Sequence, residues 1–272
     1  DVAGGEIAEL YNGGSPVLSF DDFPQKSNIE TWFRLDQTEI YSGSTWQLND
    51  ASSAYPSSLN FDGNTSYIHC VDDSSSLSLT TELTVSMWVN ISGGASYRGL
   101  FTKGSINPNG YGSYSASIIN NSNNKIRFYL GSSTSVSVNL ETTTGLSNNT
   151  WYHLAFVYDG SQGLAKVYVD GSPVPTTSPT IPSSIYSNTE DFHIGAYYSD
   201  LLLFNGKISN VAIYNTALQD PNVETLYNNG TPQATIYGTP VSHWKLNNTT
   251  TGVQDSAGSN NGTNNGTTKV IG

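Results

Sequence analysis

The sequence predicts an all-β fold, a sandwich of two antiparallel sheets with short terminal helices. Three observations indicate this fold. Gly, Ser, Thr and Asn dominate the 272 residues, whereas charged residues reach only 12%. Apolar and polar residues alternate with a period of two in several stretches, as in half-buried strands. Asp-Gly pairs, which favour turns with positive φ, end some of these stretches.

The clearest strands are predicted in the middle of the chain. Residues 83–90 alternate between apolar and polar side chains, which indicates a strand with one core face. Residues 151–158 are apolar on both faces, as expected of a central strand that is covered on each side. Residues 164–170 follow after a short polar link, so these two strands are predicted to form a hairpin.

A further strand and a short helix are predicted near the end. In residues 206–214 the apolar positions cannot share one face in perfect register, and a β-bulge near Ser209 and Asn210 would reconcile them. In the helix that follows, Asp220 is predicted as the N-cap, Pro221 as the first helical residue and Gly230 as the stop.

The two ends of the chain resemble each other. Residues 6–16, which include a predicted terminal helix, reappear as residues 222–232, and the Trp-bearing stretch 31–36 reappears as residues 243–247. A repeat of roughly 200 residues is too long for a solenoid unit and suits whole domains in tandem.

This repetition predicts the domain boundaries. Residues 1–27 would be the C-terminal tail of a preceding repeat and a linker, residues 28–230 the sandwich, and residues 231–272 a linker and the first strand of a following repeat. The start at Asp1, without an initiator Met, favours a processed chain or a part of a longer one. Partial sandwiches would leave unpaired edges, so the Trp244 strand of one chain could be completed by a neighbour, head to tail.

Five motifs, in this order and spacing, resemble the laminin G-like family of the concanavalin A-like lectin superfamily. They are Leu59–Gly63, Leu83–Trp88, Trp151–Gly160, Val167–Gly171, and Gly206–Asn215 with a closing Leu226–Asn228. The resemblance implies a jelly roll of two antiparallel sheets. It leaves the activity open, because the superfamily includes sugar-binding modules, adhesion and spacer domains, viral coat and fibre proteins, and some glycosidases.

Composition narrows the partners and the location. The formal net charge is −12 and the ten Lys and Arg are scattered, which disfavours nucleic acid and anionic lipid as partners. No apolar run approaches the ~20 residues of a membrane-spanning helix, so no membrane insertion is expected. Cys70 is the single cysteine and is predicted to be a core residue. We expect an extracellular protein on a cell or virion surface.

No catalytic residue is predicted, and the expectation is a protein that is not an enzyme. The resemblance implies that glycosidases of this superfamily place alternate Glu and Asp on one strand, and no such stretch occurs. Glu190 and Asp191 are adjacent and would face opposite ways on a strand. His153 has no acidic partner or nucleophile beside it in the sequence and is predicted to be a core or sheet-face histidine.

Binding sites are predicted in loops. A sugar site combines an exposed aromatic ring with amides and carboxylates that bond hydroxyl groups. The loop 107–112 and the stretch 196–200 offer this mixture, and their candidate ligand-binding residues are Asn109, Tyr111, Tyr197, Tyr198 and Asp200. The resemblance also implies a calcium ion, Ca²⁺, held by carboxylates and carbonyls at the sandwich edge. The candidate metal ligands are Asp72, Asp73 and Asp200.

The sequence contains sequons for N-glycosylation and is consistent with three functions. The candidate N-glycosylation sites are Asn64, Asn90, Asn120, Asn148 and Asn229. The first function is a non-catalytic structural or adhesive repeat that binds glycans or neighbouring copies of the same protein and polymerises head to tail, where copies of a weak contact give avidity. The alternative is a carbohydrate-binding module with a lectin-like site. A glycoside hydrolase of the same fold is the third, disfavoured by the missing acid pair.

Overall fold

The computed structural model describes residues 38–42, 45–49, 57–72, 75–94, 97–104, 112–119, 123–132, 137–197, 201–233 and 235–270. The chain divides into two compact units, Asp1–Ser53 and Ala54–Gly272. In the first unit, β1 (Thr38–Ser42) pairs antiparallel with β2 (Thr45–Asn49). The predicted tail 1–27, with its terminal helix, and the predicted strand 31–36 lie outside the described residues.

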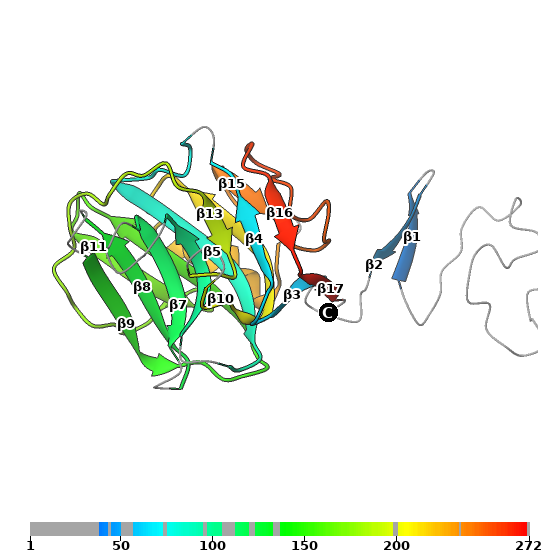
Figure 1. Ribbon diagram of the computed structural model, residues 1–272, viewed down its shortest axis with the longest axis horizontal. Helices are drawn as coiled ribbons and strands as arrows, with labels where there is room; N and C mark the ends of the chain where they lie inside the picture. Colours follow the sequence, from blue (N-terminus) through cyan, green and yellow to red (C-terminus); the bar gives the residue numbers. More distant parts are fainter. Residues whose placement is uncertain are drawn as a thin grey trace, which may run out of the picture. The chain divides into compact units, whose positions relative to one another are not determined.

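The second unit is a β-sandwich, which confirms the predicted fold class (Figure 1). Within the described ranges, the eight-stranded sheet has the order β12 (Ser172–Pro173), β11 (Leu164–Val169), β10 (Trp151–Asp159), β5 (Glu82–Ile91), β14 (Asn205–Tyr214), β3 (Ser58–Asp62) and β17 (Thr268–Val270), with β15 (Ser242–Trp244) also paired to β14. The seven-stranded sheet has the order β16 (Gly262–Asn265), β4 (Tyr67–Cys70), β13 (Phe192–Ile194), β6 (Tyr97–Lys103), β7 (Tyr114–Ile119), β8 (Lys125–Gly131) and β9 (Ser137–Gly145).

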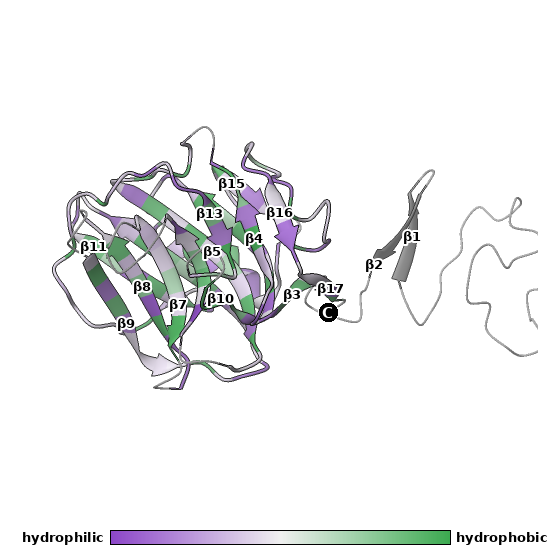
Figure 2. Cartoon of the chain, viewed as in Figure 1, coloured by the Kyte–Doolittle hydropathy of each residue, from purple (hydrophilic) through white to green (hydrophobic). Residues whose placement is uncertain are grey.

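The core lies between the two sheets. Hydrophobic and hydrophilic residues alternate along many of the strands, because successive side chains of a strand point to opposite faces (Figure 2). Phe156 of β10 packs against Phe101 of β6 and Phe128 of β8, with ring centroids 5.2 and 5.4 Å apart. Cys70 is buried in the same cluster, as the sequence predicts.

The predicted hairpin is present: β10 and β11 are paired, and β10 lies between β11 and β5. Leu154 of β10 pairs with Val169 of β11 on one side and with Met87 of β5 on the other. The bulge predicted near Ser209 and Asn210 is also present, because the β14–β5 register shifts there and Asn210 has a φ of 54°.

A short helix covers the outer face of the eight-stranded sheet. Val223 of α2 (Asp220–Tyr227) packs against Ala155 and Val157 of β10, and the 3₁₀ turn η5 (Asn228–Gly230) follows. The helix and the segment before it bury the second face of β5, where the sequence predicts a single core face.

The predicted start of this helix is wrong by one residue. Gln219 is the N-cap and Asp220 is already helical. The carboxylate of Asp220 does not cap the helix. It accepts hydrogen bonds from Lys166 Nζ at 2.7 Å and Tyr168 Oη at 2.6 Å, both on β11.

The C-terminal residues correct the predicted boundary at residue 230. β15 pairs with β14, β16 pairs with β4, and β17 pairs with β3. Residues 242–270 therefore supply strands to both sheets of the same sandwich, and they are not the isolated first strand of another repeat. The physical reason is that their apolar side chains are buried in this core, with Trp244 and Leu246 both fully inaccessible.

Candidate functional site

The outer face of the seven-stranded sheet carries polar and aromatic side chains. Registers across the strands place one row of residues on this face: Thr263, His69, His193, Thr102, Ser115, Tyr129 and Asn139. The alternating residues between them, such as Ile68, Phe101 and Phe128, belong to the core. Thr102, Ser115 and Tyr129, in the middle of the row, are buried. Thr263 and Asn139 are exposed and His69 and His193 are partly exposed, so only the two ends of the row offer polar side chains to a ligand.

An arginine on β8 organises one part of this face. Arg127 bonds Glu141 of β9 through Nη2 at 2.5 Å and through Nε at 2.9 Å. Its guanidinium carbon lies 5.1 Å from the centre of the Tyr97 ring on β6, and Nη2 is 3.5 Å from the Tyr97 hydroxyl. Arg127 and Glu141 keep 23% and 36% of their side-chain surface exposed, so a ligand can reach them.

Tyr197 lies close to this group. Burial raises the pKa of Tyr197. The charge of Arg127 and a hydrogen bond with the Ser115 hydroxyl act to lower this pKa, but burial outweighs them. A glycine lets the segment that carries Tyr197 approach the sheet: a Cβ at Gly99 would lie 2.0 Å from the backbone of Ala196 and Tyr197. We call Tyr97, Arg127, Glu141 and Tyr197 the arginine–tyrosine cluster.

Two leucines follow Tyr197 on the same segment. Leu201 and Leu202 expose 54% and 44% of their surface, more than the other leucines whose burial the structure describes. Leu202 has a φ of 53°, and its carbonyl accepts a hydrogen bond from the Gly99 N–H at 2.7 Å. The segment therefore offers apolar surface beside the polar cluster.

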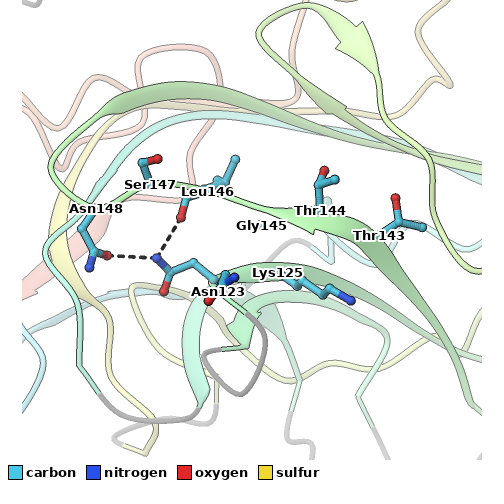
Figure 3. Close-up of a pocket in the computed structure, with 9 residues that line it drawn as sticks. Asn123, Lys125, Thr143, Thr144, Gly145, Leu146, Ser147 and Asn148 are labelled. Atoms are coloured by element: carbon cyan, nitrogen blue, oxygen red, sulfur yellow. Dashed lines mark hydrogen bonds between the residues drawn. The ribbon is translucent and has the colours of Figure 1, made fainter.

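A cavity of about 740 Å³ borders β8 and the end of β9 (Figure 3). Asn124 joins its two sides by donating to the Leu146 carbonyl and the Asn148 amide oxygen, both at 2.9 Å. Lys125 lines the cavity and lies two residues before Arg127 on β8, so both share the outer face. Lys125 is thus the cavity residue that lies nearest to the arginine–tyrosine cluster along β8.

Histidines occupy the other side of the same face. The rings of His69 on β4 and His193 on β13 stack with centroids 4.9 Å apart. His69 Nε2 lies 2.7 Å from an oxygen of Asp191. Burial acts to raise the pKa of Asp191, but the hydrogen bonds from His69 and from the Asp72 N–H outweigh it and lower that pKa.

The structure describes only part of the predicted ligand site. Tyr197 is a member of the arginine–tyrosine cluster. Asn109, Tyr111, Tyr198 and Asp200 lie outside the described residues. Sequence reasoning missed Tyr97, Arg127 and Glu141, since they come from three strands and only the sheet register brings them together. The one available signal was Arg127 itself, a charged residue between the apolar Ile126 and Phe128.

Asp72 is turned inward, away from any rim site. Its carboxylate lies 2.9 Å from Lys103 Nζ, and neither side chain has exposed surface. The Asp72 carboxylate is therefore paired with a buried ammonium. No group of three His, Cys, Asp or Glu side chains converges in the parts of the chain that the structure describes. Calcium at Asp73 and Asp200 stays a prediction, because both residues lie outside those parts.

The predicted glycosylation sites differ in accessibility. Asn64, Asn148 and Asn229 are exposed. Asn90, near the end of β5, is only 9% exposed, so its amide is much less accessible than those three. Asn120 lies outside the described residues.

His153 is a buried sheet residue, as predicted. Its Nε2 lies 2.9 Å from the Ser86 hydroxyl, and Trp88 and Tyr227 pack around its ring. Burial lowers the pKa of His153 to about 3. Glu141 is bonded to Arg127 and Asp191 to His69.

The chain belongs to the concanavalin A-like lectin/glucanases superfamily, whose family model matches residues 62–224. It is similar in structure to a Bacteroides ovatus protein that has been assigned as a carbohydrate binding protein, with a TM-score of 0.60 and 19% identity. That match covers 85% of this chain and 65% of the other, just under two thirds of its length. The shared feature is the fold.

A second similar structure is domain 4 of an extracellular arabinanase from Geobacillus stearothermophilus, in complex with arabinotriose. Its TM-score is 0.48 at 21% identity, over 70% of this chain and 81% of the domain. No curated protein sequence matches the chain. Among the described residues, no helix is both long and apolar enough to span a bilayer.

Proposed function

We propose that this protein is a non-catalytic carbohydrate-binding module and that the arginine–tyrosine cluster holds the glycan. The observation that carries the proposal is the partly exposed Arg127–Glu141 pair with the Tyr97 ring under the guanidinium and Tyr197 within electrostatic reach of it. Sugars present hydroxyl groups at their edges and apolar C–H faces, so they are bound by paired polar groups beside aromatic rings. The structural similarity to a protein assigned to carbohydrate binding supports this.

The cluster favours a neutral, extended glycan. Glu141 already compensates the charge of Arg127, so the pair offers donors and acceptors without a net charge. Lys125 and the cavity continue the surface along β8, which suits several sugar units in a row. The exposed Leu201 and Leu202 add apolar surface for the faces of the sugar rings.

The proposed setting is a repeat of a larger adhesive protein outside the cell or on a virion. The likeness of residues 222–232 to residues 6–16 supports this setting, because it indicates related domains in series. In such an array each module needs only weak affinity.

Binding of the full-length chain to a glycan array tests the function. We expect saturable binding to neutral oligosaccharides, and Arg127→Ala and Tyr197→Ala should each weaken it by roughly tenfold or more, or ~1.4 kcal/mol. The matched control is Lys166→Ala on the other sheet, where Lys166, Asp220 and Tyr168 form a similar cation, acid and tyrosine group. Equal binding by all three variants would contradict the proposed site.

A further inference from the structure

Residues 241–270, here called the complementing segment, complete the sandwich at several points. The Trp244 ring stacks on Phe192, and its Nε1 donates to the Asn260 carbonyl at 2.8 Å. His243 Nε2 lies 2.6 Å from the amide oxygen of Asn210 at the bulge of β14, and the Asn210 N–H donates to the Lys245 carbonyl at 2.9 Å. The segment is thus held by stacking, by hydrogen bonds and by three strand pairings.

Four side chains of the complementing segment are central to this fit. Trp244, Leu246 and Val253 are buried in the core. Asp255 closes the turn: its carboxylate accepts the N–H groups of His243, Ala257, Gly258 and Asn260 at 2.9–3.0 Å. We call the place in the sandwich that these side chains fill the slot. The slot accepts a segment with an aromatic residue, a leucine two positions later and a turn-forming aspartate further on.

A stretch near the beginning of the chain has the same pattern of residues. In the sequence, Phe33 and Leu35 in the stretch 31–36 correspond to Trp244 and Leu246, and Asp50 precedes small residues as Asp255 does. The N-terminal copy has the β1–β2 hairpin between these positions, where the complementing segment has the shorter turn 247–252. A single chain therefore contains two segments whose sequence pattern fits one slot.

We propose that the complementing segment is exchangeable: it can complete the sandwich of a second copy of this chain while the N-terminal stretch of its own chain takes the slot. Both arrangements bury the same kinds of side chain, so the exchange costs little in contacts, as in domain swapping. The contact is head to tail and does not close on itself, so repeated exchange links copies in an open series. This inference is independent of the glycan-binding proposal, because the arginine–tyrosine cluster lies outside the slot.

Disulfide trapping tests the exchange with full-length chains. Thr263 of β16 lies directly opposite His69 of β4, and opposed residues of an antiparallel pair have the Cα separation that a disulfide needs. One preparation carries His69→Cys and the other Thr263→Cys. We expect the mixture, held at high concentration and then oxidised, to form a disulfide-linked dimer of one chain of each kind.

Three controls make the result decisive. The double variant His69→Cys with Thr263→Cys should cross-link within one chain and shows that the pair can react. Replacing Thr263→Cys by Ser161→Cys, in the exposed turn between β10 and β11, measures random collision and should give several-fold less dimer. The unmodified chain measures any contribution of the buried Cys70. Cross-linking of the double variant, with no dimer from the mixture above the Ser161 control, would overturn the proposal.

A second variant tests the role of the N-terminal stretch. Phe33→Ser with Leu35→Ser should weaken the competing segment and reduce the yield of mixed dimer several-fold, because the complementing segment then keeps its own slot. A yield that does not change would overturn the claim that the two segments are interchangeable.

Discussion

The Trp244 ring lies parallel to the Phe192 ring, with centroids 5.6 Å apart and 7° between the planes. Trp244 comes from the last part of the sandwich and Phe192 from β13, in the middle of the other sheet. Phe192 also stacks on Phe101 at 5.9 Å. The contact therefore joins the C-terminal strands to the aromatic centre of the core.

Phe192→Ala should destabilise the sandwich by about 3–5 kcal/mol, since it removes a buried ring and leaves a cavity. Urea unfolding followed by tryptophan fluorescence measures the change, and the emission of Trp244 should shift to the red in the folded variant. Tyr237→Ala, at a residue that is 36% exposed, is the control and should change stability little. A loss below 1 kcal/mol for Phe192→Ala would contradict the packing described.

Local patterns in the sequence predicted much of the sandwich. The alternation in residues 83–90 and the two-sided apolar stretch 151–158 report directly on burial, and both strands are present. The slip in residues 206–214 predicted the bulge, where Asn210 takes the left-handed conformation that asparagine tolerates. Such features depend on residues that are close together in the sequence, so the sequence alone predicts them.

The boundary at residue 230 could not be found this way. Similarity between the two ends shows that residues 243–247 resemble residues 31–36, but it does not show which slot either stretch fills. Tyr97, Arg127 and Glu141 of the arginine–tyrosine cluster were missed for a related reason. Arg127 meets Glu141 across a β8–β9 register that shifts beside Arg127, and no spacing in the sequence encodes this shift.

Gly99→Ala should disturb the segment that carries Tyr197. The new Cβ would lie 2.0 Å from the Ala196 and Tyr197 backbone, so the segment must move away from β6. We expect a loss of about 1–3 kcal/mol in stability and weaker glycan binding, measured by thermal unfolding and by titration with the best array ligand. Gly163→Ala is the control: its φ of 58° costs about 1 kcal/mol, but nothing lies within 4 Å and binding should persist.

Stability should fall as the pH is lowered from about 6.5 towards 4. Burial lowers the pKa of His153 to about 3 and that of His243 to about 4. Below about pH 6.5 the unfolded chain takes up protons at these histidines and the folded chain does not, so protonation favours unfolding. Urea unfolding at a series of pH values above 5 keeps most carboxylates ionised in both states and measures this effect.

His153→Gln isolates one of the two histidines. Glutamine can keep a hydrogen bond to the Ser86 hydroxyl and has no proton to gain, so the variant should show a shallower decline of stability between about pH 6.5 and 5. A pH dependence identical to that of the parent protein would mean that His153 is not the neutral, buried group described above.

The buried pair of Lys103 and Asp72 should behave as a unit. Both side chains are fully inaccessible, and Lys103 Nζ also donates to the Glu190 carbonyl. Lys103→Met or Asp72→Leu alone leaves one charge without its counter-charge in the core, and each should cost about 3–5 kcal/mol. The combined variant removes both charges and should recover most of that loss, because apolar side chains of similar size often replace buried ion pairs at little cost. Chemical unfolding of the four proteins gives the coupling free energy, and simple additivity of the two losses would show that the pair is not coupled.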